Sequence, residues 1–189
     1  NVNKRYIDKE LFIDKSYNTY QLTDIDNEIL SDTTDYRVFN VAAGLSNASS
    51  SYYHNSINGY HAAKLRRFQE YYDYLSIHDN EKLFNSLNVK YLIAKDENNE
   101  DQLYQNPDAL GNAWSVDSLI TVDTADKLLI KLKDTDISKV ALSINNSVPS
   151  SISKVYNSGD LVKIEKTKIS SSHITYEFES LSDQLIVFS

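Results

Sequence analysis

Segments with the period of a helix and segments with the period of a strand follow one another along this chain, and this order constrains its fold most. Residues 35–42 alternate polar and apolar side chains, which is typical of a half-buried strand, and residues 89–94 form a short apolar run typical of a buried strand. Between them, residues 60–77 repeat apolar side chains at steps of three and four, which predicts a helix with one inward face. That face consists of Leu65, Phe68, Tyr72 and Leu75.

Further segments extend the same pattern. Helices are expected at 24–30, capped by Thr23 or Asp24, and at 80–87. A further helix is expected to run through Lys133, capped by Asp123 or Thr124. Leu128, Leu129 and Leu132 should face the core from the last of these. Strands are expected on either side of it, at 113–122 and 139–144, and this order predicts a right-handed crossover onto one sheet.

The last part of the chain changes in composition. Beyond residue 145 it becomes rich in Ser and Asn, and three alternating runs follow at 161–168, 173–179 and 184–188. Such runs predict an antiparallel meander. Because the third run ends at residue 189 with no turn after it, we expect the sheet to be truncated there and to continue in a longer protein.

Taken together, the segments predict an α+β fold. We expect a mixed sheet with two or three packed helices, followed by the antiparallel β meander. The predicted divisions are an extended N-terminal arm at 1–34, an α/β core at 35–145 and an antiparallel β segment at 146–189.

Composition narrows the possible partners. The net charge of −8 would repel a phosphate backbone, so nucleic acid is not an expected partner. The chain lacks Cys, which excludes disulfides, thiolate metal sites and Cys nucleophiles. It also lacks an apolar run of about 18 residues, so no membrane-spanning helix is expected in it. Because it starts with Asn1 and has no Met, we expect it to be part of a longer protein.

Motifs for catalysis or cofactor binding are missing from the sequence. The four His residues show no metal-binding spacing, and the acidic stretch at 96–101 lacks the Gly and terminal Glu of a calcium-binding loop. No Gly-rich phosphate loop and no Gly-x-Ser-x-Gly elbow is present. We therefore expect no metal, no cofactor and no catalytic residue in this chain.

Residues 47–67 are the candidate for ligand binding, because hydrogen-bonding groups and ring faces are dense there. Cations at the start of a helix, next to free backbone N–H groups, would suit a phosphate or carboxylate. Alternatively, Arg66 and Arg67 pair with Glu70 and Asp73 along the helix, or with the acidic arm, and have a structural role. The candidate ligand-binding residues are Asn47, Tyr52, Tyr53, His54, Tyr60, His61, Lys64, Arg66 and Arg67.

Several ordered blocks resemble the Bacteroidetes branch of the YfhO family, whose members are large bacterial membrane proteins with many transmembrane helices and a soluble extracytoplasmic portion. The blocks are DYRVFNVA at 35–42, NASSSYYH at 47–54, GYHAAKLRR at 59–67, LNVKYLI at 87–93 and NPDALGNAW at 106–114. The resemblance then becomes thin until QLIVFS at 184–189, and the Tyr-Tyr and Gly-Trp segment that usually follows in the family is absent.

The resemblance implies a parent similar to the GT-C class of glycosyltransferases, with its catalytic residues outside this chain and this part on the outer face of the membrane. The chain would then shape an acceptor or lipid-linked sugar site, with Tyr52, Tyr53, Tyr60 and His61 toward the sugar and Lys64, Arg66 and Arg67 toward a lipid phosphate. The alternative is a scaffold that docks on its own transmembrane region and contacts no ligand. A free-standing carbohydrate hydrolase, the third hypothesis, would need a pair of carboxylates in a cleft.

Overall fold

The computed structural model describes residues 20–60, 62–145, 147–149, 151–170 and 172–189. The helices are α1 (Asp24–Leu30), α2 (Arg66–His78), α3 (Asn80–Ser86) and α4 (Ala125–Lys133), with 3-10 turns η3 (Gly44–Ser46), η4 (Ser50–Tyr52) and η5 (Ser158–Asp160). The strands are β1 (Arg37–Asn40), β2 (Val89–Lys95), β3 (Asp101–Gln105), β4 (Ala113–Val116), β5 (Ser118–Val122), β6 (Val140–Ile144), β7 (Leu161–Ile169), β8 (Ile174–Ser180) and β9 (Leu185–Phe188). The α+β class is confirmed.

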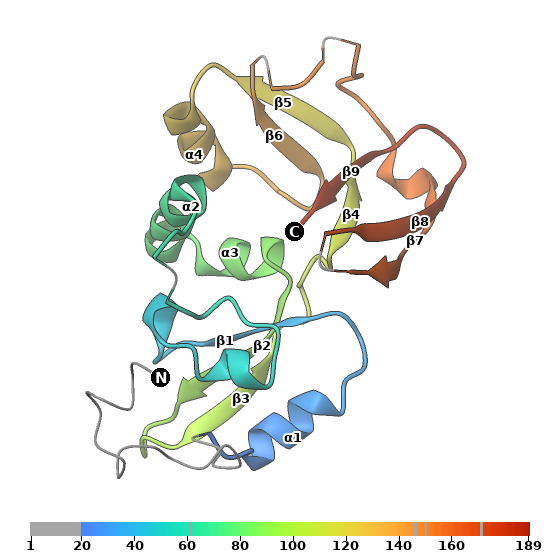
Figure 1. Cartoon of the computed structure of the whole chain (residues 1–189). Coiled ribbons are helices and arrows are strands. Elements are labelled where there is room, and N and C mark those ends of the chain that lie inside the picture. Colours follow the sequence, from blue (N-terminus) through green and yellow to red (C-terminus); the bar gives the residue numbers. More distant parts are fainter. Residues whose placement is uncertain (1–19, 61, 146, 150, 171) are drawn as a thin grey trace, which may run out of the picture.

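A three-stranded mixed sheet forms the core of one end of the molecule (Figure 1). Strand β2 lies in the middle, parallel to β1 and antiparallel to β3. Because successive side chains of a strand point to opposite faces, Val38 packs with Ile29 and Ile93 in a core under α1. Phe39 contacts Tyr72 of α2 and belongs to the opposite face. The sheet is thus covered on both faces.

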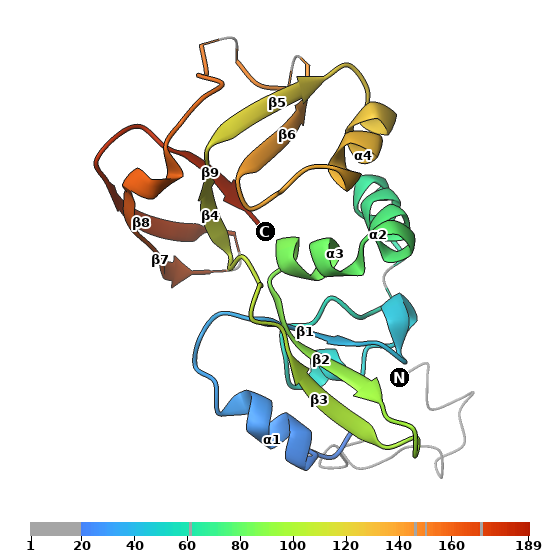
Figure 2. The same cartoon turned by 180° about the vertical axis from the view of Figure 1, so that it is seen from behind.

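A second core joins the three later helices. Leu75 of α2, Leu83 of α3 and Leu132 of α4 are at most 4% exposed and pack together. Helix α4 connects β5 to β6, which pair in parallel, so the predicted strand–helix–strand unit is present. Seen from behind, α2 and α3 lie between the three-stranded sheet and the β5–β6 pair, and α4 lies beside that pair (Figure 2).

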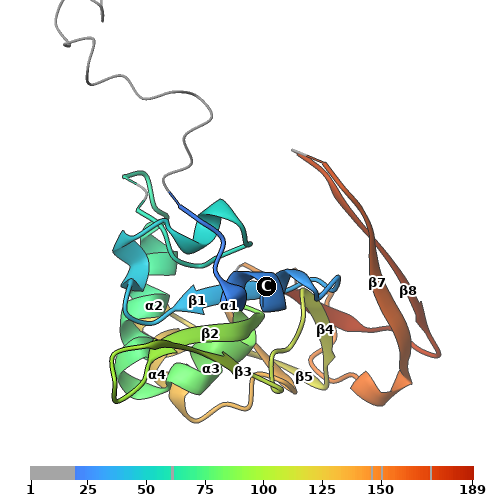
Figure 3. The same ribbon diagram turned by 90° about the horizontal axis from the view of Figure 1, so that it is seen from below.

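The remaining strands form two antiparallel pairs. β7 and β8 make a hairpin at one side of the molecule (Figure 3). The third predicted run, β9, pairs with β4 and not with β8, so the meander has two strands and β9 joins another sheet. This pairing depends on contacts across about 70 residues of chain, which alternation alone does not encode.

Two predicted segment boundaries were wrong. The strand expected at 113–122 is two strands in different sheets, because the chain leaves β4 at Asp117, whose carboxylate accepts a hydrogen bond from the Ser158 backbone (3.0 Å). The helix expected from residue 60 starts at Arg66, after Gly59 with φ +140° and an extended Leu65. Leu65 is 76% exposed, so it does not face the core as predicted. Strand β3 was not predicted.

Helix α1 begins with a capping box. The Thr23 hydroxyl accepts a hydrogen bond from the Asp26 backbone N–H (3.1 Å), and the Asp26 carboxylate accepts one from the Thr23 N–H (2.9 Å). Thr23 was one of the two caps expected from the sequence. Residues 1–19 of the predicted N-terminal arm lie outside the described residues.

Replacing Thr23 by Ala removes this cap. We expect the free energy of unfolding to fall by about 1 kcal/mol, because one backbone N–H loses its acceptor and the reciprocal geometry is lost. Urea unfolding followed by circular dichroism measures the change. Thr33→Ala is the matched control, since Thr33 is exposed and outside the cap. Equal losses in both variants would contradict the capping role.

Candidate functional site

The loop at 44–58 is tied to the edge strand β1 by its own polar side chains. The Asn58 amide, 5% exposed, accepts a hydrogen bond from the Asn40 N–H (2.7 Å) and donates to the carbonyls of Asn40 (2.9 Å) and Gly44 (2.6 Å). The Ser56 hydroxyl donates to the Val38 carbonyl (3.1 Å). Many of the donors and acceptors that make this stretch a candidate therefore hold the loop in place.

His54 is buried in the fold and does not face a ligand site with its Nε2. Its side chain is fully buried, and its Nε2 lies 2.9 Å from Asp26 Oδ1 of α1. Burial by itself would raise the pKa of Asp26, but hydrogen bonds from Thr23 and His54 outweigh it and lower this pKa. His54 thus joins the loop to the capped end of α1, so its Nε2 is engaged within the fold.

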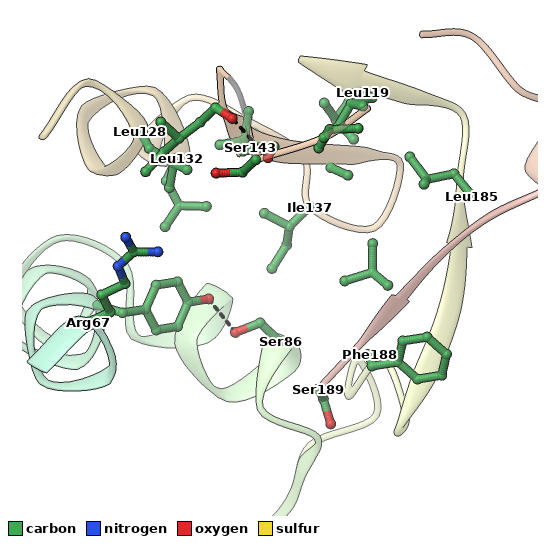
Figure 4. Close-up of a pocket in the computed structure, with 18 of the residues that line it drawn as sticks. Arg67, Ser86, Leu119, Leu128, Leu132, Ile137, Ser143, Leu185, Phe188 and Ser189 are labelled. Atoms are coloured by element: carbon green, nitrogen blue, oxygen red, sulfur yellow. Dashed lines mark hydrogen bonds between the residues drawn. The ribbon is translucent and has the colours of Figure 1, made fainter. Parts of the chain in front are cut away.

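The three predicted cations do not gather at one place. Arg66 pairs with Glu70 (Nε to Oε1, 2.6 Å) at the surface, where its side chain is 91% exposed, as the structural alternative predicted. Lys64 Nζ donates to Gln69 Oε1 (2.8 Å). Arg67 has no ion pair or side-chain hydrogen bond within the described part of the chain, and its guanidinium points toward α4 (Figure 4).

The other candidates are spread out. The Asn47 side chain accepts a hydrogen bond from the Ser49 N–H (2.8 Å) and so shapes the turn before η4. Tyr60 is 76% exposed and lies outside the cavities that follow. His61 lies outside the described residues.

Tyr52 and Tyr53 belong to a small polar cavity of about 330 Å³, which we call the tyrosine hollow. The Tyr52 ring is 5.0 Å from Tyr53 and 5.5 Å from Tyr20 between centroids, and the Tyr53 hydroxyl donates to the Tyr20 carbonyl. Tyr52 is 56% exposed, so its ring is open to a ligand. The hollow is lined by Asp32, Thr34, Tyr36, Ser51, Tyr52, Tyr53, His54 and Asn55.

Asp32 is the charged group in the wall of this hollow. Its Oδ2 accepts hydrogen bonds from Lys90 Nζ (2.6 Å) and the Tyr91 hydroxyl (2.8 Å), and its Oδ1 accepts one from the Thr34 N–H (2.8 Å). The Lys90 bond above all holds the pKa of Asp32 far below its usual range. Burial and the bond to Asp32 raise the pKa of Tyr91 to about 12. Asp32 is therefore an ionised acceptor at neutral pH.

Sequence reasoning missed Asp32, Thr34 and Tyr36 as part of this site. They come from the turn between α1 and β1, about 20 residues before Tyr52. The polar run at 31–35 between a predicted helix and a predicted strand was the one available signal, and such runs are usually solvated turns.

A second, larger cavity of about 790 Å³ is lined mostly by apolar side chains, and we call it the apolar groove (Figure 4). Its walls come from α2 and the end of α3 on one side, α4 and β6 on another, and β9 on a third. Leu128, Leu129 and Leu132, which were expected to face the core, are among its lining residues.

The described residues show neither a metal-binding cluster nor a membrane-spanning helix. Among them, no group of three or more His, Asp or Glu side chains is placed to hold a metal ion. No helix within these ranges is both long and apolar enough to cross a membrane.

Comparisons with known proteins identify no relative: no family model, no curated protein and no solved structure matches the chain. The geometry of the two cavities is therefore the basis for the functional proposals.

Proposed function

We propose that the chain is a non-catalytic, extracytoplasmic domain of a YfhO-like membrane protein and that it helps to shape the acceptor or lipid-linked sugar site of a glycosyltransferase-like parent. The observation that supports this proposal is the tyrosine hollow. The YfhO-like sequence blocks supply the membrane-protein context, and the hollow supplies a surface whose chemistry suits a sugar.

The hollow combines the two kinds of contact that a sugar ring needs. The Tyr52 face is a flat apolar platform for the C–H side of the ring, and a ring at this position loses little conformational freedom on binding. Asp32, Ser51 and Asn55 also line the hollow and carry a carboxylate, a hydroxyl that donates to the Asn58 carbonyl, and an amide. A volume of about 330 Å³ lies at the lower end of the range for small-ligand sites, which fits a ligand of one or two rings.

Tyr52→Ala tests the proposal. In NMR titrations of the chain with maltose, cellobiose and chitobiose, we expect at least one sugar to shift the amide signals of residues 51–55. We expect Tyr52→Ala to weaken that binding roughly three- to tenfold, because the stacking surface is lost.

Tyr60→Ala is the matched control, since Tyr60 is also an exposed tyrosine but lies outside the hollow. It should bind as the unchanged chain does. Absence of shifts at residues 51–55 with all three sugars, or an equal loss in the two variants, would count against sugar binding at the hollow.

A second candidate function is a scaffold that docks on its own transmembrane region. The pairing of Arg66 with Glu70 and of Lys64 with Gln69 favours it, because both cations are already bonded to side chains of α2. In the membrane-embedded parent, a scaffold predicts that Tyr52→Ala leaves activity per molecule unchanged. The sugar-site function predicts that this activity falls while protein abundance stays the same.

A further inference from the structure

Several polar groups in the wall of the apolar groove already have hydrogen-bond partners within the fold. The Trp114 indole N–H donates to the Ile137 carbonyl (3.0 Å), and the Tyr71 and Ser86 hydroxyls bond to each other. The wall therefore offers few hydrogen bonds to a ligand, and a sugar or nucleotide placed there would leave its own polar groups unpaired. The groove suits an aliphatic chain.

One end of the groove carries a positive charge without a counterion. Arg67 and Glu70 are the charged side chains among the lining residues, and Glu70 is paired with Arg66. Arg67 has no ion pair among the described residues, and Figure 4 shows its guanidinium extending from α2 toward Leu128 and Leu132 of α4. An apolar channel with a guanidinium at its end is complementary to an anionic headgroup on a hydrocarbon tail.

We infer that the apolar groove binds a single-chain anionic amphiphile of the fatty-acid type, with the tail along α4 and β6 and the carboxylate on Arg67. A volume of about 790 Å³ lies within the range of cavities that enclose small ligands. Burying the tail against leucine and isoleucine side chains supplies the affinity, and the forked Arg67 guanidinium orients the headgroup. This site is separate from the tyrosine hollow and does not depend on the sugar-site proposal.

The groove contains its own reporter, because Trp114 is the single tryptophan of the chain and is one of its lining residues. Oleate, titrated below its micelle concentration, is expected to change Trp114 fluorescence with saturation at one ligand per chain. Calorimetry of the same titration should give the same stoichiometry. Arg67→Gln is expected to weaken oleate binding about tenfold and to leave binding of the uncharged oleyl alcohol unchanged.

Lys64→Gln is the matched control, because Lys64 is a cation next to the start of α2 but bonds to Gln69 and lies outside the groove lining. It should bind oleate as the unchanged chain does. Light scattering of the chain without ligand should show a monomer. No saturable signal by fluorescence and calorimetry would overturn the inference, as would equal effects of Arg67→Gln and Lys64→Gln. A dimer that oleate does not dissociate would also overturn it, since a second copy of the chain would then fill the groove.

Discussion

Replacing Leu75 by alanine is expected to lower the free energy of unfolding by about 2–5 kcal/mol. Leu75 is 0% exposed and packs with Leu83 and Leu132, so it connects α2 to both α3 and α4. The shortened side chain leaves a cavity that helices already fixed by their loops and strands can fill only in part. Urea unfolding followed by circular dichroism, with the slope of the transition compared between variants, measures the loss.

Leu65→Ala is the control for this experiment. The sequence period places Leu65 and Leu75 on one helix face, yet Leu65 is 76% exposed and precedes the first turn of α2. We expect its replacement to change the free energy of unfolding by no more than about 0.5 kcal/mol. A loss as large as that of Leu75→Ala would show that the helix begins before Arg66 and that Leu65 packs inward.

Elements specified by nearby residues could be predicted from the sequence. Helix α4 has its cap at Thr124, as expected, and α1 has its cap at Thr23, because a cap needs only residues within one turn. Strand β2 could be predicted because its apolar run has polar residues on both sides. These signals are local, and long-range packing did not override them.

Elements specified by distant residues could not be predicted. Strand β3 has exposed residues at four of its five positions, with Leu103 alone turned inward, so its sequence shows no alternation. Strand β9 was expected as a strand, but its partner β4 lies about 70 residues earlier. Strand pairing is set by contacts between segments, and a single sequence does not record which segments meet.

The candidate site shows the same limit. A dense run of Asn, Ser, Tyr and His predicts a ligand surface, but Asn58 and His54 have the same donors and acceptors whether they face a ligand or the fold itself. In the structure they hold the loop to β1 and α1. Tyr52 is the predicted residue that stays open to a ligand in the hollow, and its neighbour Asp32 comes from another segment.

Asp32→Asn is expected to lower the free energy of unfolding at pH 7 by roughly 1–3 kcal/mol. The Asp32 side chain is 12% exposed, and its carboxylate accepts hydrogen bonds from Lys90 and Tyr91 of β2 and from the Thr34 backbone. The amide has the same shape but carries no charge, so the bond to the Lys90 ammonium loses its ionic part. The change also removes the ionised acceptor from the tyrosine hollow.

The pH dependence of this stability loss shows whether the charge of Asp32 causes it. An aspartate in an unfolded chain has a pKa of about 3.9, and the folded structure holds the pKa of Asp32 well below this. A lowered folded-state pKa contributes stability that is present above the unfolded value and is lost as the pH falls toward the folded value. The difference in unfolding free energy between the unchanged chain and Asp32→Asn should therefore be constant from pH 7 to about pH 5 and shrink below about pH 4.

Asp123→Asn is the matched control, because Asp123 also accepts a hydrogen bond from a lysine, Lys127 (2.6 Å), but its side chain is 64% exposed. Solvent screens this pair, so the substitution should have a much smaller effect at pH 7 and across the same range. Urea unfolding at pH 7, 5, 4 and 3 compares the two variants. If the Asp32→Asn difference stayed constant down to pH 3, the lost stability would come from the changed hydrogen-bonding geometry and not from the charge of the carboxylate.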